Sequence, residues 1–166
     1  PSPRVPHKQQ RNMDAETLSD ELLGRDIRPT ALRILILRTM KEMDCAASLA
    51  DLEERLVTVD KSTIFRTLTL FLAHHIVHAV DDGTGAVKYA VCRPGCHCGE
   101  DGADELGDLH THFYCEGCHH TFCLRGLPVP VVSLPEGFRL HTANYVLKGL
   151  CPECAARASA RTVATD

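Results

Sequence analysis

The 166-residue sequence contains no tryptophan, and aromatic residues make up only 5% of it. No apolar run approaches the roughly 18 residues of a membrane-spanning helix, and no secretory signal pattern opens the chain. The net charge of −4 excludes a generally polycationic nucleic-acid binder. We therefore expect a cytoplasmic protein without membrane association, in which any contact with DNA comes from a local basic face.

Cysteine, by contrast, is abundant, with nine in the chain. In a reducing compartment, closely spaced cysteines more often bind metal than form disulfides. Two Cys-x-x-Cys pairs, Cys115/Cys118 and Cys151/Cys154, supply the four thiolates that a tetrahedral structural Zn²⁺ takes. Such a site is closed, which makes it structural rather than catalytic.

The first half of the chain carries helical signals. Residues 14–23 have a helical pattern that Gly24 ends, and Thr30 is a candidate N-cap for the next helix. Ser48 and Asp51 have capping-box spacing at the start of a third helix. In the second helix one predicted apolar face combines Leu32, Leu35, Ile36, Thr39, Met40 and Met43.

A fourth helix, capped by Asp60 or Ser62, follows in "DKSTIFRTLTLFLAHH". Its predicted inward face holds Ile64, Leu68, Phe71 and Leu72, and its opposite face is predicted to hold Thr63, Arg66 and Thr67. A small polar face with one arginine suits the DNA major groove, because arginine can bond bidentately to guanine. An ordinary solvated face is the alternative interpretation of this stretch.

After that helix, "HIVHAV" and "AVKYAV" flank "DDGTG", which is typical of a β-hairpin with a glycine-containing turn. Three helices, a reading helix and a two-stranded wing describe a winged helix-turn-helix. This order of elements favours DNA binding over the solvated-face alternative. Arg25 and Arg28, just before the second helix, are candidates for phosphate or minor-groove contacts.

The densest cluster of metal-binding residue types is "LHTHFYCEGCHHTFC". His110 and His112 alternate along a predicted strand, so their side chains share one face, whereas Cys115 points to the other. One strand can therefore supply a metal-binding pair on one face and begin the four-cysteine site on the other.

Three motifs together resemble the Fur family of metal-responsive repressors, from about residue 20 to Cys154. They are "STIFRTL", similar to the family's reading helix; "HTHFYCEGC", its H-x-H-x-x-C-x-x-C motif; and "GLCPEC", its closing G-L-C-x-x-C. The resemblance implies a bacterial, homodimeric repressor of metal-uptake genes that binds palindromic double-stranded operator DNA and no small organic substrate. In one departure from the family, Phe65 stands where a tyrosine is usual in the reading helix.

The resemblance also implies a sensory metal at the hinge, with His78, Cys92, His110 and His112 as ligands. Three imidazoles and a thiolate suit Zn²⁺ in a tetrahedron, whereas iron-sensing relatives commonly place a carboxylate at the position of Cys92. The zinc-sensing Zur branch is therefore favoured, with an Fe²⁺-sensing regulator as the alternative.

The predicted fold class is α+β: an N-terminal winged helix-turn-helix domain, then a small α/β dimerisation domain with a structural four-cysteine zinc site. Residues 1–13 are expected to be a disordered arm or an expression remnant. The winged-helix DNA-binding domain is placed at 14–91, a hinge with an inserted loop at 92–109, the zinc-bound dimerisation domain at 110–154 and a C-terminal tail at 155–166.

Two alternatives remain at this stage. Cys96, His97 and Cys98 in the inserted loop could bind an extra metal, haem or an oxidant, which would make the chain a diverged redox- or haem-responsive regulator of the same fold. An enzyme is not expected, since catalytic zinc keeps an open position and zinc deaminases need a His-x-Glu that this chain lacks.

Overall fold

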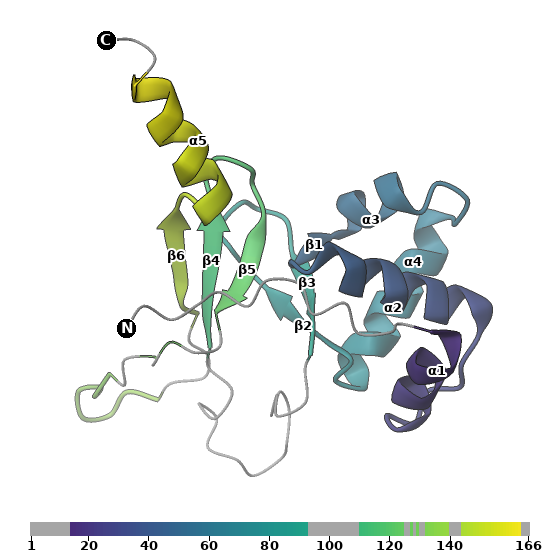
Figure 1. Ribbon diagram of the computed structural model, residues 1–166. Coiled ribbons are helices and arrows are strands. Elements are labelled where there is room, and N and C mark those ends of the chain that lie inside the picture. The colour runs from purple at the N-terminus through teal and green to yellow at the C-terminus, as the bar shows by residue number, and fades with distance from the viewer. Residues whose placement is uncertain are drawn as a thin grey trace.

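The computed structural model describes residues 14–92, 110–124, 127, 129, 132–139 and 144–163. The chain folds into two lobes, which we call the N-terminal lobe (residues 14–92) and the C-terminal lobe (residues 110–163) (Figure 1). Helices and a small sheet form the first lobe, and a second small sheet with one helix forms the other. The predicted α+β class is confirmed.

Four helices make up most of the N-terminal lobe: α1 (Ala15–Leu23), α2 (Ala31–Met43), α3 (Leu49–Arg55) and α4 (Lys61–Ala73). Each begins after a polar residue whose side chain accepts a hydrogen bond from a backbone N–H three positions on: Asp14, Thr30, Ser48 and Asp60. The capping box predicted at Ser48 and Asp51 is present, with both reciprocal bonds made. Local sequence therefore fixes where these helices start.

The core of this lobe lies where α4 packs against α2 and α3. Ile64, Leu68 and Phe71 of α4 are each 0% exposed, as is Leu52 of α3. Full burial of a side chain of this size contributes roughly 1.5–3 kcal/mol. This packing holds α4 in place and leaves its opposite face to solvent.

Two sequence predictions about helix faces are wrong. Thr67 is 7% exposed, because it lies three residues after Ile64 and four before Phe71 and so shares their buried face. On α2, Leu32 and Leu35 are 44% and 37% exposed, and the buried stripe runs through Ile36, Leu37 and Met40 instead.

The wing is an antiparallel sheet in the order β1-β3-β2, built from β1 (Ala47–Ser48), β2 (Val77–Val80) and β3 (Lys88–Val91). The predicted hairpin is confirmed, whereas β1 is an addition that the sequence did not indicate. Gly83 and Gly85 in the turn have φ values of 75° and 84°, which residues with a Cβ rarely adopt. In this register His78 lies opposite Ala90, and Val80 lies opposite Lys88.

In the C-terminal lobe the sheet order is β5-β4-β6. The central strand β4 (Thr111–Cys115) pairs antiparallel with β5 (Thr121–Leu124) and parallel with β6 (Val146–Gly149). Helix α5 (Pro152–Val163) follows β6 and extends away from the sheet (Figure 1). Much of the stretch interpreted from sequence as a C-terminal tail is therefore helical.

The two sheets meet through β5. The backbone N–H of Ala46, just before β1, donates to the carbonyl of Thr121 at 2.8 Å. Cys123 packs against Ala46, Val80 and Ala90 of the wing. The first residues of β5 are thus shared between the lobes. Among the described helices, none combines the length and apolar character that a membrane span requires.

Candidate metal centres and nucleic-acid interface

The four cysteines of the two Cys-x-x-Cys pairs converge at one end of the C-terminal sheet. Cys115 ends β4, Cys118 lies in the turn after it, and Cys151 and Cys154 lie at the start of α5. Their four sulfur atoms all lie within 4.8 Å of one another. This cluster, which we call the four-cysteine site, is positioned to bind zinc with four thiolates.

Backbone geometry supports the four-cysteine site. Burial raises the pKa of Cys115, but N–H groups of Cys151, Cys118 and Gly117 donate to its sulfur and bring that pKa down to about 6. A Cβ at Gly117 would lie 3.0 Å from both Cβ and Sγ of Cys154, so a larger residue there would press on a cysteine of this site. The guanidinium of Arg157 donates to Sγ of Cys154 at 3.3 Å and offsets the negative charge of a thiolate.

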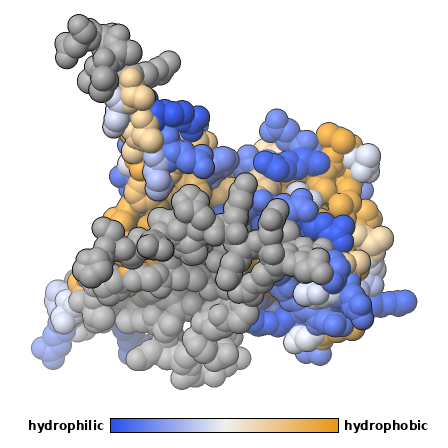
Figure 2. Space-filling view, viewed as in Figure 1, coloured by the Kyte–Doolittle hydropathy of each residue, from blue (hydrophilic) through white to orange (hydrophobic). Residues whose placement is uncertain are grey.

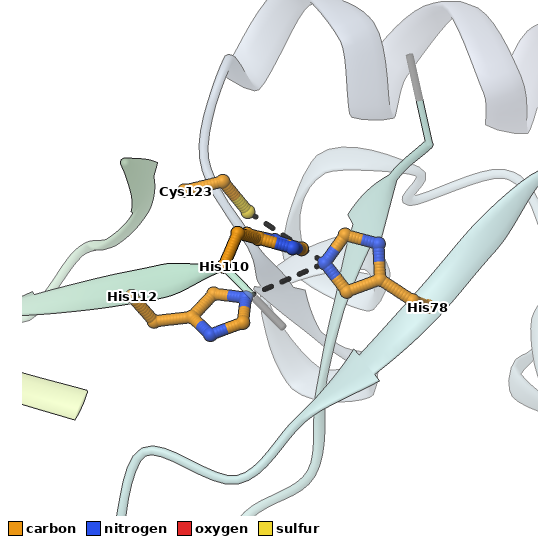
Figure 3. A group of neighbouring side chains, drawn as sticks. All are labelled: His78, His110, His112 and Cys123. Carbon is orange, nitrogen blue, oxygen red and sulfur yellow. Dashed lines mark hydrogen bonds between the residues drawn. The ribbon is translucent and has the colours of Figure 1, made fainter. Parts of the chain in front are cut away.

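A second cluster lies between the lobes, and we call it the inter-lobe cluster (Figure 3). It consists of His78 from β2, His110 and His112 at the start of β4, and Cys123 from β5. One donor atom from each lies within 4.8 Å of all the others. Nε2 of His78 is 3.4 Å from Nε2 of His112 and 3.7 Å from Sγ of Cys123.

The rings of the inter-lobe cluster gather around one point. The His110 centroid lies 4.8 Å from that of His78 and 4.5 Å from that of His112. His112 is 7% exposed, and the other three members are partly buried. Three imidazoles and one thiol form a four-donor set of the kind that binds Zn²⁺ tetrahedrally, so the residues present fit such an ion.

Three of the four predicted sensory ligands are in this cluster, and the structure places the fourth differently. Sγ of Cys92 lies 3.5 Å from Nδ1 of His78, whereas the other ring nitrogen of His78, Nε2, faces the cluster. Cys123, which the sequence analysis does not propose as a ligand, is in the cluster. Strand register explains this, because Cys123 lies directly opposite His112 in the β4–β5 pair and therefore shares its face.

The outer face of α4 is polar at its N-terminal end. Asp60 accepts hydrogen bonds from the backbone N–H of Thr63 at 2.9 Å and from its Oγ1 at 2.6 Å. A hydrogen bond from the Ser62 hydroxyl, together with these two from Thr63, lowers the pKa of Asp60. Arg66 is exposed, and its guanidinium bonds to the Ser62 carbonyl and to Oγ1 of Thr63 on its own helix. Phe65 beside it is 52% exposed.

Arg25 and Arg28 are both exposed in the segment between α1 and α2. The carbonyl of Arg25 lies 2.8 Å from Nδ1 of His74, the C-cap of α4. Arg25 therefore lies near the end of α4 that is remote from Arg66. The loop residues Cys96, His97 and Cys98 lie outside the described residues, as does the segment 1–13.

Comparison with solved structures identifies the fold of this chain. No protein-family model and no curated protein matches the sequence. Solved structures do match: a zinc uptake regulator complexed with zinc and DNA has a TM-score of 0.57 at 22% identity, covering 92% of this chain and 99% of that one. This chain has the Fur fold.

Two further structures with the Fur fold agree. Holo XcZur has a TM-score of 0.56 at 19% identity and covers 88% of this chain and 99% of that chain. The Vibrio cholerae ferric uptake regulator has a TM-score of 0.52 at 16% identity and covers 80% and 98%. At these identities the likeness establishes the fold.

Proposed function

We propose that the chain is a metal-dependent, sequence-specific DNA-binding transcriptional regulator rather than an enzyme. The inter-lobe cluster is the observation that carries this proposal. It takes His78 from the wing and its other three donors from the C-terminal sheet. A metal ion held there would tie the lobe that carries α4 to the C-terminal lobe, whereas a cluster inside one lobe would not.

The switch follows from that placement. A ligand shifts an equilibrium between two arrangements only by its differential affinity for them. The donors of His110, just before β4, of β4 and of β5 meet the donor on β2 only when the wing lies against the C-terminal sheet. Bound metal would therefore favour that arrangement and fix the direction in which α4 is presented.

Zinc is the ion we propose at both clusters. Four thiolates suit a structural Zn²⁺, and three imidazoles with one thiolate suit a sensory Zn²⁺. Fe²⁺ at the inter-lobe cluster is the competing assignment. The structures with this fold include a ferric uptake regulator and a zinc uptake regulator with zinc and DNA, so the fold itself admits either.

We propose His78, His110, His112 and Cys123 as the sensory ligands. Cys92 would then act beside the ligand set: with Nε2 of His78 directed at the metal, Nδ1–H would donate to the Cys92 sulfur. Outer partners of this kind fix the orientation of a ligating imidazole.

The two thiols can be separated by cobalt substitution. We expect Co²⁺ bound at the inter-lobe cluster to show thiolate charge-transfer absorption that Cys123→Ser removes. Cys92→Ser should keep the absorption and bind Co²⁺ roughly 10–100-fold more weakly, as typical for an outer partner. The opposite pattern would make Cys92 the ligand and return the assignment to the one expected from sequence.

The proposed partners are double-stranded palindromic DNA and a second copy of the chain. The outer edge of β6 carries exposed Leu147, and Leu150 follows it, at 49% and 44% exposure. Figure 2 shows apolar surface in this region, beside the base of α5. Burying this edge in a homodimer would place two copies of α4 symmetrically, to match a palindromic operator.

For DNA contact we propose the exposed N-terminal end of α4. Arg66→Ala is expected to weaken binding to the preferred operator by about 1–3 kcal/mol if the guanidinium reads a guanine. The operator would first be selected from random duplexes by the zinc-loaded protein. Fluorescence anisotropy at fixed salt would then compare the selected duplex with a scrambled one. An equal loss on both duplexes would make Arg66 a phosphate contact.

The function as a whole is tested by the same anisotropy assay under metal control. We expect tight binding to the selected duplex with buffered Zn²⁺ and weak binding at zinc activities that fill only the four-cysteine site. An anaerobic titration with Fe²⁺ distinguishes the iron assignment. DNA binding that is independent of both metals would contradict the proposal.

A further inference from the structure

Beside the inter-lobe cluster lies a second set of buried polar side chains, Asp82, Lys88 and Thr121, which is separate from the four metal donors. Nζ of Lys88 is 2.8 Å from Oδ2 of Asp82, and the two side chains are 10% and 0% exposed. Oγ1 of Thr121 donates to the same carboxylate oxygen at 2.5 Å. Asp82 and Lys88 belong to the wing, whereas Thr121 begins β5 of the other lobe.

Lys88 also contacts the loop that carries Cys115 and Cys118 of the four-cysteine site. Nζ of Lys88 donates to Oγ1 of Thr121 at 3.1 Å and to the carbonyl of His119 at 3.0 Å. His119 lies in the turn that follows Cys118, and its N–H bonds to the carbonyl of Cys115. The wing is therefore attached directly to the loop that carries the structural cysteines.

Register places this group alongside the sensory ligands. Lys88 lies opposite Val80, two residues along β2 from His78, so His78 and Lys88 share one face of the wing sheet. Thr121 and Cys123 likewise share one face of β5. The facing surfaces of the wing sheet and of β5 thus carry the inter-lobe cluster and, beside it, the hydrogen-bonded ion pair of Asp82 and Lys88.

We propose that Asp82, Lys88 and Thr121 are positioning residues that clamp the wing to β5 and so preorganise the inter-lobe cluster for its metal. This inference rests on the proposed function, because it assigns the three residues a role at the same switch. A buried ion pair adds little net stability by itself, but leaving its charges unpartnered is costly. Separation of the lobes takes the Thr121 hydroxyl away from Asp82, so the clamp favours the closed arrangement.

The measurable consequence is a change in metal affinity without a change in ligands. A metal that binds only the closed arrangement has an apparent Kd equal to its intrinsic Kd divided by the closed fraction. Thr121→Val removes the hydroxyl but keeps the shape and β-branching. We expect it to weaken zinc binding at the inter-lobe cluster on the order of tenfold, as loss of a hydrogen bond to a charged group implies.

The matched control is Thr121→Ser, which keeps the hydroxyl and should bind zinc within about twofold of the natural chain. A second variant, Thr84→Val, removes a hydroxyl that donates to Asp82 within the wing turn; because Thr84 is exposed, we expect this variant to fold normally. We expect a smaller loss in the same direction. Zinc affinity would be measured by competition with a chromophoric chelator, with the four-cysteine site already filled.

The anisotropy assay supplies the second readout. At saturating zinc, Thr121→Val should bind the selected duplex as tightly as the natural chain, because the closed arrangement is then fully populated. Unchanged zinc affinity in both Thr121→Val and Thr84→Val would overturn the clamp. If the natural chain itself binds no zinc at this cluster, the proposed function fails instead, and the two failures are thereby distinguished.

Discussion

Replacing His112 by alanine is expected to abolish the zinc dependence of DNA binding while leaving the four-cysteine site filled. His112 supplies one of four donors in the inter-lobe cluster, and its Nε2 lies 3.4 Å from that of His78. Without it only three donors would remain to hold an ion there. Allosteric coupling typically changes affinity about 5–150-fold, and the gain in DNA affinity on adding zinc should disappear.

The control is His120→Ala, which removes an exposed histidine from the same segment but outside the inter-lobe cluster. Anisotropy with the selected duplex, with and without buffered zinc, would be read beside zinc content per chain. His120→Ala should behave as the natural chain. A His112→Ala protein that still gained affinity on zinc addition would show that the cluster does not carry the signal.

Replacing Cys118 by serine should have the largest effect on folding. The four-cysteine site joins the end of β4 to the start of α5, and structural zinc contributes roughly 10–16 kcal/mol in zinc-finger peptides near neutral pH. The C-terminal sheet has only three described strands and little other core, so it should lose its fixed structure with the metal. We expect loss of zinc and a lowered melting temperature by circular dichroism.

Cys45→Ala is the matched control for that experiment. Cys45 lies in the helical lobe outside both clusters, and burial raises the pKa of its thiol to about 11, so it is not poised to bind metal. It should retain zinc and melt close to the natural chain. If Cys118→Ser kept a full complement of tightly held zinc, the four-cysteine assignment would be wrong.

The helical lobe could be predicted from sequence because its determinants are local. Caps at Thr30 and Ser48 and the spacing of Ile64, Leu68 and Phe71 act within one or two turns of chain. Thr67 was also predictable in principle, since the same spacing places it inward. Its hydroxyl is typical of an outer helix face, but the helical period decides its position.

Cys123 was harder to predict, because its role depends on strand pairing. It ends the stretch that is densest in metal-binding residue types, but the sequence does not show which residue of the preceding strand it faces, because the length of the turn decides the register. Once the β4–β5 register is known, Cys123 and His112 are direct neighbours. Cys92 contacts Nδ1 of His78, the nitrogen that faces away from the cluster. This contact depends on the orientation of the His78 ring, which no sequence pattern specifies.

Zinc stoichiometry distinguishes a chain with two zinc sites of different purpose from a chain with a structural site alone. Native mass spectrometry would follow the natural chain and His112→Ala as buffered free zinc is raised. We expect two zinc ions per chain in the natural protein, the second filling over the range in which DNA affinity rises, and one in the variant. A single zinc ion in both proteins at all zinc activities would contradict it.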